Sequence, residues 1–434
     1  MLTSRNELSP SGLIKTVQKY FAKKFPDSDW KRCQTNPSLV DCLMSCLAIF
    51  HLKYPSLLSF DKERQEDTLQ FKNLKRLYHI EQAPSDTSMR EKLDKIEPVQ
   101  IRGIFKKLFS LAQRGKVLEC YEYWNKHYLV SMDGTGQFSS SQVHCENCCL
   151  KNHSNGEITY YHHALAAVLV HPQMKRVIPL APEAITKEDG ATKNDCEQNA
   201  AKRLLRDLRR EHPHLKMIMN EDSLYSTGPH VELLKELDLR FIIGAKPGNL
   251  GTLFDWVKHL DMDELEREDA RGFQHRYRYT NGVPLNDTYF ETKVNFLEYW
   301  ETDTKGNVQH FSWITDIPLN PKTVELVMRG GRARWRIENE TFNTLKNQGY
   351  NYEHNYGHGE KNLCSVMGML MLAVFLIDQL SELCDAAFQK AKAATRTYYN
   401  FWAQMRFVFL YFEFDSWDSL FAKITVANSR QSTA

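Results

Sequence analysis

Three acidic side chains stand where they could bind metal ions together. Asp133 follows the apolar run 128–132, Asp222 follows the run 215–219, and Glu338 lies in an arginine-rich segment. Two divalent ions roughly 3.5–4 Å apart can stabilise both the attacking and the leaving oxygen of a phosphodiester. Hard ions such as Mg²⁺ take oxygen ligands, which converging carboxylates supply. These residues could therefore serve metal-dependent cleavage of a phosphodiester.

Two glutamates compete for the third acidic position. Glu338, Phe342 and Leu345 are spaced i, i+4 and i+7, so they share one face of a predicted helix. Arg334 lies one turn earlier on the same face. Glu340 lies about 200° away from Glu338, at roughly 100° per residue. If Phe342 and Leu345 face the core, Glu338 points inward, and we therefore favour Glu338.

Each acid alone has a more ordinary interpretation. An Asp before Gly, as in Asp133-Gly134, is usually a turn former. A Glu on an arginine-rich helix is usually a salt-bridged surface residue. Only the three acids together, at matching positions in one order of strands and helices, make the metal hypothesis coherent.

The elements that would carry these acids alternate between strands and helices. A helix with the apolar stripe Ala201, Leu204, Leu205 and Leu208 follows three strands, and a shorter helix covers 231–237. The predicted strands cover 128–133, 164–170, 176–180, 215–219 and 240–244. Three strands before a helix predict an antiparallel meander, and the later alternation predicts parallel crossovers. This is the order of a ribonuclease H-like mixed sheet in an α/β protein.

The rest of the chain divides around this core. Residues 1–120 predict a helical N-terminal domain, a candidate for DNA binding or dimerisation. The further predicted parts are the first half of the catalytic core (121–250), a β-rich insertion (251–320), the second half of the core (321–380) and a C-terminal helical tail (381–434). Within the insertion, Asn281-Gly282 predicts a tight hairpin turn.

Composition describes a globular chain without naming a partner. Of 434 residues, 42% are hydrophobic and 25% are charged, and the formal net charge is only +2. A nucleic-acid partner must therefore be argued from local clusters. One cluster holds Lys202, Arg203, Arg206, Arg209 and Arg210, and another holds Arg329, Arg332, Arg334 and Arg336. Such runs are more often solvated helix faces.

The apolar segments predict no membrane association. The most apolar run, 366–377, has twelve residues, whereas a membrane span needs about 20. We therefore predict a buried helix there. Met1 to Arg5 lack the apolar stretch of a signal peptide. The ten cysteines lack the regular spacing of a disulfide framework, so we expect an intracellular protein with reduced thiols.

Cysteines and histidines cluster between the first two predicted strands. Cys145 and Cys148 have the spacing of a zinc knuckle. A structural Zn²⁺ could use both, together with two residues from the set Cys149, His153, His162 and His163. Because a second Cys-x-x-Cys pair is missing, reduced structural thiols are the alternative.

The acids and their neighbours resemble those of the DDE transposases of bacterial insertion sequences. The resemblance rests on Asp133-Gly-Thr, on Asn220-Glu-Asp-Ser-Leu-Tyr and above all on Arg334-Trp-Arg-Ile-Glu338 with the following Asn-Glu and Phe-Asn-Thr-Leu-Lys. It covers roughly residues 84 to 380. It is strongest to the group with a Y-R-E-K signature and a β-insertion before the last Glu.

Two positions depart from that signature. Gly331 stands where the signature Tyr is expected. Leu345 stands where the signature Lys is expected, and Lys346 follows one residue later. The spacing from Arg334 to Glu338 agrees with the signature.

The resemblance implies an activity and a set of site residues. Asp133, Asp222 and Glu338 would bind Mg²⁺, for which Mn²⁺ could substitute. Arg334 and Lys346 would hold DNA phosphates, and we group Arg336 with them as DNA-binding. Metal-activated water would nick the transposon ends, and the freed 3′-OH groups would attack target DNA in cut-and-paste transposition.

The resemblance also implies partners and a location. Double-stranded DNA, both the terminal inverted repeats and the target, would be bound by a homodimer, with no membrane involved. The expected location is the bacterial cytoplasm, in association with the nucleoid. The alternative function is a catalytically inactive or repurposed DNA-binding protein derived from a transposase.

Overall fold

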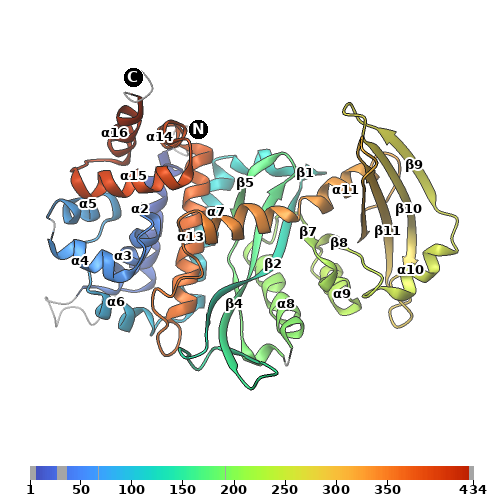
Figure 1. Ribbon diagram of the computed structural model, residues 1–434, viewed down its shortest axis with the longest axis horizontal. Helices are drawn as coiled ribbons and strands as arrows, with labels where there is room; N and C mark the ends of the chain where they lie inside the picture. Colours follow the sequence, from blue (N-terminus) through green and yellow to red (C-terminus); the bar gives the residue numbers. More distant parts are fainter. Residues whose placement is uncertain (1–5, 27–36, 67, 191, 430–434) are drawn as a thin grey trace.

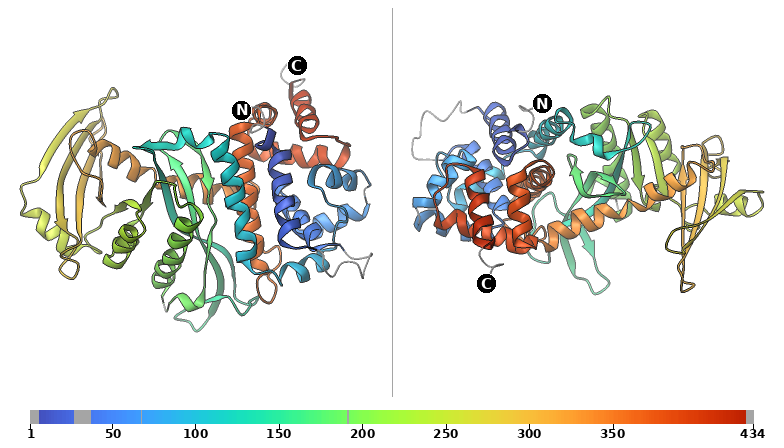
Figure 2. Two further views of the ribbon diagram at one scale, coloured as in Figure 1. Left: turned by 180° about the vertical axis from the view of Figure 1, so that it is seen from behind. Right: turned by 90° about the horizontal axis from the view of Figure 1, so that it is seen from above.

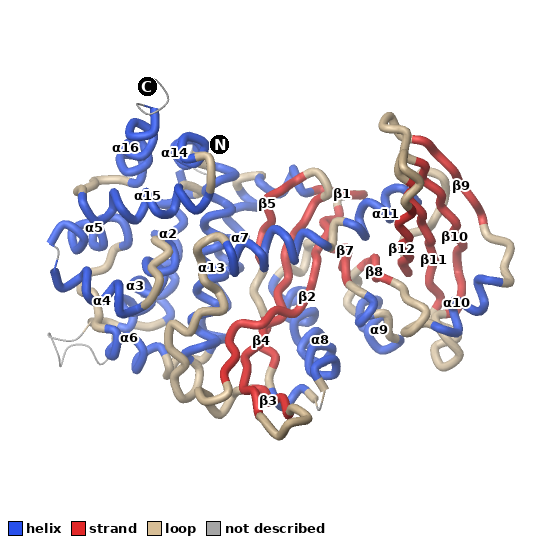
Figure 3. The backbone as a smooth tube through the Cα atoms, in the orientation of Figure 1, coloured by secondary structure: helices blue, strands red, loops and turns tan. Residues whose placement is uncertain are grey.

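The computed structural model describes residues 6–26, 37–66, 68–190 and 192–429. Residues 1–5, on which the signal-peptide expectation rests, lie outside these ranges. Helices from both ends of the chain form one end of the elongated molecule, a mixed sheet occupies the centre, and four strands form the other end (Figure 1 and Figure 3).

Helices from the two ends of the sequence pack into one helical region. Ser38 begins one of them with a capping box that Asp41 completes. The helices are α2 (Pro10–Lys24), α3 (Leu39–His51), α4 (Leu57–Glu66), α5 (Thr68–Tyr78), α6 (Asp86–Leu93), α7 (Pro98–Arg114), α13 (Leu363–Cys384), α14 (Ala386–Thr395), α15 (Tyr398–Tyr411) and α16 (Trp417–Ser429). The predicted N-terminal domain and C-terminal tail therefore lie side by side (Figure 1).

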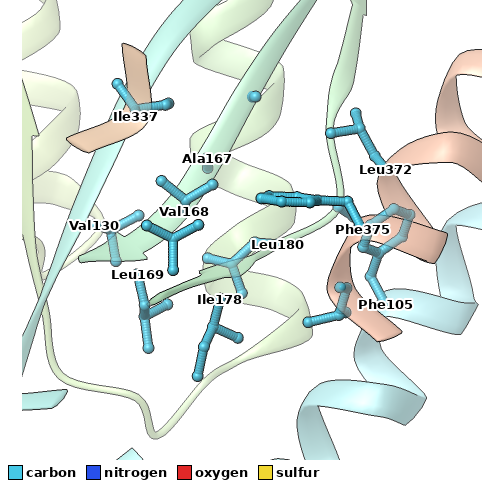
Figure 4. Close-up of a cluster of buried hydrophobic side chains, with 14 of the residues drawn as sticks. Phe105, Val130, Ala167, Val168, Leu169, Ile178, Leu180, Ile337, Leu372 and Phe375 are labelled. Atoms are coloured by element: carbon cyan, nitrogen blue, oxygen red, sulfur yellow. The ribbon is translucent and has the colours of Figure 1, made fainter. Parts of the chain in front are cut away.

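The long apolar helix α13 is a core helix of the molecule. It contains the run 366–377 that the sequence predicts as buried. Its length and composition would also fit a membrane span, but 94% of its most apolar window is buried inside the protein. It packs against α3, α7 and β5. Figure 4 shows Phe375 and Leu372 of this helix against Phe105 and the apolar residues of the sheet.

The central sheet has the predicted order of strands and helices. Its strands are β1 (Glu122–Trp124), β2 (His127–Ser140), β3 (Cys149–Asn152), β4 (Ile158–His171), β5 (Met174–Pro179), β6 (Glu183–Ile185), β7 (Met217–Glu221) and β8 (Arg240–Gly244), of which β1, β3 and β6 are additions to the prediction. The helix α8 (Lys193–Glu211) connects β6 to β7, and α9 (Gly228–Glu236) connects β7 to β8. β2 pairs antiparallel with β4, and β4 with β5. β2, β7 and β8 are parallel. The predicted meander and parallel crossovers are both confirmed.

The first strand is longer than predicted, and Asp133 does not end it. β2 continues through Gly134 to Ser140 and keeps pairing with β4. The pairing with β7, however, stops at Ser131. The Asp-Gly pair is therefore no turn. At this pair, β2 is no longer paired with β7 but is still paired with β4.

The insertion is a set of strands that extends the same sheet. It comprises α10 (Gly251–Lys258), β9 (Asp263–Glu268), β10 (Gln274–Pro284), β11 (Lys293–Thr302) and β12 (Val308–Thr315). β12 pairs antiparallel with β8 of the core. The hairpin predicted at Asn281-Gly282 is wrong, because β10 runs through both residues with a shift of register. Gly282 adopts φ +73° there, so it serves a β-bulge rather than a turn.

The chain returns from the insertion to the core across one face of the sheet. α11 (Val324–Arg332) is followed by a π-helix (Ile337–Phe342) and by α12 (Asn343–Asn347). α8 and α9 lie on the opposite face (Figure 1 and Figure 2). The segment 332–346, which carries the predicted helix, is helical but not regular. A turn at 333–334 interrupts the helix, and the π-helix begins three residues later.

A buried ion pair ties the N-terminal helices to α13. Lys53 Nζ lies 2.8 Å from Asp378 Oδ2, and both side chains are buried. His51 Nε2 lies 3.1 Å from Asp378 Oδ1, and the Tyr350 hydroxyl donates to Oδ2 at 2.6 Å. A single carboxylate therefore serves three partners from two regions of the chain.

We expect Asp378→Asn to destabilise the protein by about 3–5 kcal/mol, because Lys53 would be left buried without an opposite charge. Urea unfolding followed by circular dichroism measures this change. The control is Glu413→Gln, which removes the exposed pairs to Lys72 and Arg76 and should cost about 1 kcal/mol or less. Equal effects of the two substitutions would contradict the assigned role of the buried pair.

Candidate active site

Asp133 and Asp222 extend from neighbouring parallel strands at matching positions. Ser131 of β2 pairs with Asn220 of β7, and each acid lies two residues further along. Residues two apart on a strand point to the same face, and paired strands lie about 4.8 Å apart. The carboxylates therefore start from the same edge of the sheet and face the same way.

Arg334 joins the third acid to the first. Its guanidinium lies 3.4 Å from Asp133 Oδ2 and 2.7 Å from Glu338 Oε1. Arg334 occupies the turn between α11 and the π-helix, while Glu338 lies in the first turn of the π-helix. π-helical segments occur often at functional sites. The interrupted helix thus brings Glu338 beside Asp133.

Glu340, the competing acid, points to another part of the surface. It pairs with Arg336 at 3.5 Å and lines a cavity of about 680 Å³ between the insertion and α11. Glu338, and not Glu340, is among the charges that perturb Asp133 most strongly. This arrangement favours Glu338 as the partner of Asp133 and Asp222.

The electrostatics of Asp133 reflect a crowded acidic site. The pKa of Asp133 is raised to about 7, and burial of the carboxyl group is the largest cause. Arg334 lowers this pKa, whereas repulsion by Glu197, Glu338 and Asp222 contributes to the rise. The acids therefore interact directly. A divalent cation bound between them would relieve that repulsion and release the proton.

Glu197 of α8 is an acid that the sequence analysis missed. A Cβ atom at Gly134 would lie 2.6 Å from Glu197 Oε2, so only glycine leaves room for this carboxylate. Neighbouring residues of a strand point to opposite faces, so Glu197 approaches from the face opposite to the Asp133 side chain. The Tyr225 hydroxyl donates to Glu197 Oε1 at 2.8 Å. A signal for it existed: Glu197 lies four residues before Ala201, on the apolar stripe of α8, and an acid on a buried stripe is unusual.

The other two predicted DNA-binding residues make local contacts. Arg336 donates to the carbonyl oxygen of Pro172 at 2.6 Å and pairs with Glu340. Lys346 pairs with Glu353 at 2.7 Å. Arg334 alone among the three directly contacts acids of the site. Phosphate binding by Arg336 and Lys346 would require these pairs to open.

A cavity of about 750 Å³ opens beside Asp222, and its lining is basic and aromatic. Trp335 is one of the lining residues and is 56% exposed. The lining also includes Lys246, Arg332, Arg334 and Trp313. Cationic side chains with an exposed aromatic ring form the kind of surface that single-stranded nucleic acid contacts.

Gly331 lies against a tryptophan. A Cβ atom at this position would lie 2.3 Å from Trp313 Nε1. Trp313 is 5% exposed and belongs to β12. Close packing of the insertion against α11 therefore leaves no room for a larger side chain, such as the Tyr that the resemblance predicts there.

In the basic cluster over 202–210, Arg203 and Arg209 make contacts within the protein. Arg203 pairs with Asp189 and Glu183. Arg209 donates to the carbonyl oxygens of Leu237 and Asp238 at 2.8 Å and 2.7 Å. These side chains stabilise the fold around α8. Arg203 and Arg209 thus have a structural role, which differs from the solvated helix face that such charge runs usually form.

The predicted zinc residues separate into two groups. Cys145 and Cys148 lie together with His162 and with His358, which the sequence analysis did not include. Cys149 instead contacts the carbonyl oxygen of Ile185, and His153 contacts Thr159. The predicted ligand set is thus wrong for Cys149 and His153, because both side chains point away from the Cys-x-x-Cys pair.

Comparison with known proteins finds a similarity of structure but none of sequence. No protein-family model matches the chain, and neither does any curated protein. Among solved structures, the chain is similar to piggyBac transposase, determined by cryo-EM in a synaptic complex with hairpin DNA. The identity is 9% and the TM-score 0.44, over 100% of this chain and 83% of that one. At these values the likeness assigns neither a family nor a function.

Divalent metal binding should depend on pH through Asp133. Because the pKa of Asp133 is about 7, Mn²⁺ affinity should rise between about pH 6 and pH 8 as its carboxyl loses the proton. Isothermal titration calorimetry with Mn²⁺ measures this dependence. Without added metal, the free energy of unfolding should fall as the pH rises from about 3.9, the pKa of Asp133 in the unfolded chain, to about 7, its pKa in the folded protein. The reason is that Asp133 loses its proton less readily in the folded protein. Asp133→Asn should therefore raise the melting temperature at pH 8, with a smaller gain near pH 4. A pH-independent affinity would contradict the assignment.

Removing the charge of Glu197 should make Asp133 more acidic. Glu197 raises the pKa of Asp133 by repulsion, so Glu197→Gln should move the pH midpoint of Mn²⁺ binding downward. Gln keeps a hydrogen-bond acceptor for Tyr225. Glu340→Gln serves as the matched control and should leave the midpoint unchanged. An upward shift with Glu197→Gln would show that the electrostatic account of this residue is wrong.

Proposed function

We propose that this protein is a DNA transposase that cleaves transposon ends and joins their 3′-OH groups to target DNA. The observation that carries the proposal is the approach of Asp133, Asp222 and Glu338 to one another. Two come from adjacent parallel strands and one from a π-helix laid across the sheet. This arrangement supports a ribonuclease H-like core of the kind expected for the Y-R-E-K group of insertion-sequence transposases.

The three carboxylates fit hard divalent cations. They supply oxygen ligands, and the negative charges of Glu338 and Asp222 repel that of the largely buried Asp133. Bound Mg²⁺, or Mn²⁺ in its place, would activate water or a 3′-OH and stabilise charge on the leaving oxygen. Asp133, Asp222 and Glu338 would hold and orient these ions, and Glu197 would add negative charge from the other side of β2.

Arg334 has a double role in this proposal. Its guanidinium bridges Asp133 and Glu338. Cations bound to those carboxylates would compete with it. Arg334 would then be free to hold a DNA phosphate in the neighbouring cavity, together with Lys246 and Arg332. This exchange would couple metal binding to DNA binding.

The decisive experiment is cleavage of DNA that carries the element's own ends, read from the sequence flanking the gene, with Mg²⁺ or Mn²⁺. Asp133→Ala, Asp222→Ala and Glu338→Ala should each slow nicking by about 10³-fold or more. Metal catalysis contributes several kcal/mol, and 1.36 kcal/mol is a factor of ten. Strand transfer of a pre-nicked end, scored on the same gel, should fall equally.

Glu340→Ala is the control, because Glu340 points away from Asp133, and it should keep its activity. Loss with Glu340→Ala but not with Glu338→Ala would overturn the assignment of the third acid. Specific binding of the ends without cleavage in either metal would favour the inactive DNA-binding protein. Activity in all the variants would exclude the carboxylate mechanism.

A further inference from the structure

A second cluster of potential metal ligands lies away from the acidic site. Cys145 and Cys148 come from the loop after β2, His162 from β4, and His358 from the loop before α13. His162 pairs with Phe138 in the sheet. Phe138 is five residues beyond Asp133, or roughly 17 Å at the rise of a strand. The cluster is therefore separate from the three carboxylates.

The distances within the cluster match those around a tetrahedral zinc ion. The two sulfur atoms lie 3.8 Å apart. His162 Nε2 lies 3.2 Å and 3.4 Å from the sulfur atoms of Cys145 and Cys148, and His358 Nε2 lies 3.3 Å from that of Cys148. With Zn–S near 2.3 Å and Zn–N near 2.0–2.1 Å, ligand atoms around tetrahedral zinc lie roughly 3.4–3.8 Å apart.

The surroundings favour a metal over a disulfide. A sulfur–sulfur distance of 3.8 Å is almost twice the bond length of about 2.05 Å. The side chains are nearly buried, with exposed fractions of 9%, 3%, 4% and 6% for Cys145, Cys148, His162 and His358. The Cys145 amide also donates to the sulfur of Cys148 at 3.4 Å. Four protein ligands leave no open position, which is typical of structural rather than catalytic zinc.

The cluster joins segments that are far apart in the sequence. The loop over 348–362 leads from α12, just after the π-helix with Glu338, to the core helix α13. Additional hydrogen bonds join the same two loops: Asn147 donates to the Lys361 carbonyl at 3.0 Å, and the Glu146 amide to the Glu360 carbonyl at 3.4 Å. The ring of Phe138 on β2 lies 4.2 Å from that of His358.

We propose that Cys145, Cys148, His162 and His358 bind one structural Zn²⁺. This ion connects the loop 348–362, which follows Glu338, to the paired strands β2 and β4. Since β2 also carries Asp133, the zinc links the chain segments that carry Asp133 and Glu338. The proposal stands on this cluster alone and does not require the protein to be a transposase.

The test is the metal content of the purified protein, measured by inductively coupled plasma mass spectrometry. We expect one zinc ion per chain in the wild type, and loss of zinc in Cys148→Ser and His358→Ala. Cys149→Ser is the matched control, because this buried neighbour contacts Ile185 instead, and it should keep its zinc. A folded wild-type protein without zinc, or zinc kept in both ligand variants, would overturn the proposal.

Two further measurements apply if the ligand variants fail to fold. Co²⁺ exchanged into the wild type should show the strong visible bands of tetrahedral cobalt together with sulfur-to-cobalt charge transfer. Treatment of the wild type with a chelator should speed tryptic cleavage after Lys361, in the loop that His358 anchors. Octahedral cobalt spectra, or cleavage unchanged after zinc removal, would each count against the site.

Discussion

Mutual repulsion among Asp133, Asp222 and Glu338 is the constraint on which the site depends. Burial of Asp133 is the largest cause of its raised pKa, and repulsion by Glu338 and Asp222 adds to it. The backbone hydrogen bonds between β2 and β7 end two residues before Asp133 and Asp222, so they fix the strands from which both acids extend. The Arg334 guanidinium compensates part of the remaining charge. The buried ion pair of Asp378 and Lys53 anchors α13, the helix to which the chain leads after Glu338.

Much of the central sheet was predictable because its signals are local. Apolar runs such as 164–170 and 240–244 give strands, and the stripe at Ala201 to Leu208 gives α8. The lengths of strands and helices were less predictable. Asp133-Gly134 has the chemistry of a turn, but pairing with β4 continues through it. Asn281-Gly282 has the same character and became a bulge, because β11 continues alongside it. In both cases tertiary pairing overrides the local preference.

The site was predictable only where its residues follow strong elements. Asp133 and Asp222 each come after an apolar stretch of the sequence, so their proximity could be inferred from the order of elements alone. Glu197 and His358 could not be found in that way, because long-range packing brings them to their places. Glu338 was chosen for a regular α-helix, whereas it lies in a π-helix after a break. The choice nevertheless agrees with the contact to Arg334.

The pairing of β12 with β8 has a mechanical consequence. Backbone hydrogen bonds run without interruption from the core into the insertion, so the insertion is not a lobe on a flexible tether. The angle between the two parts follows from the twist of one continuous sheet. A long, stiff ligand lying across both would meet a surface of fixed curvature. The ligand would then have to bend to fit it, and its own deformability would contribute to which sequences are accepted.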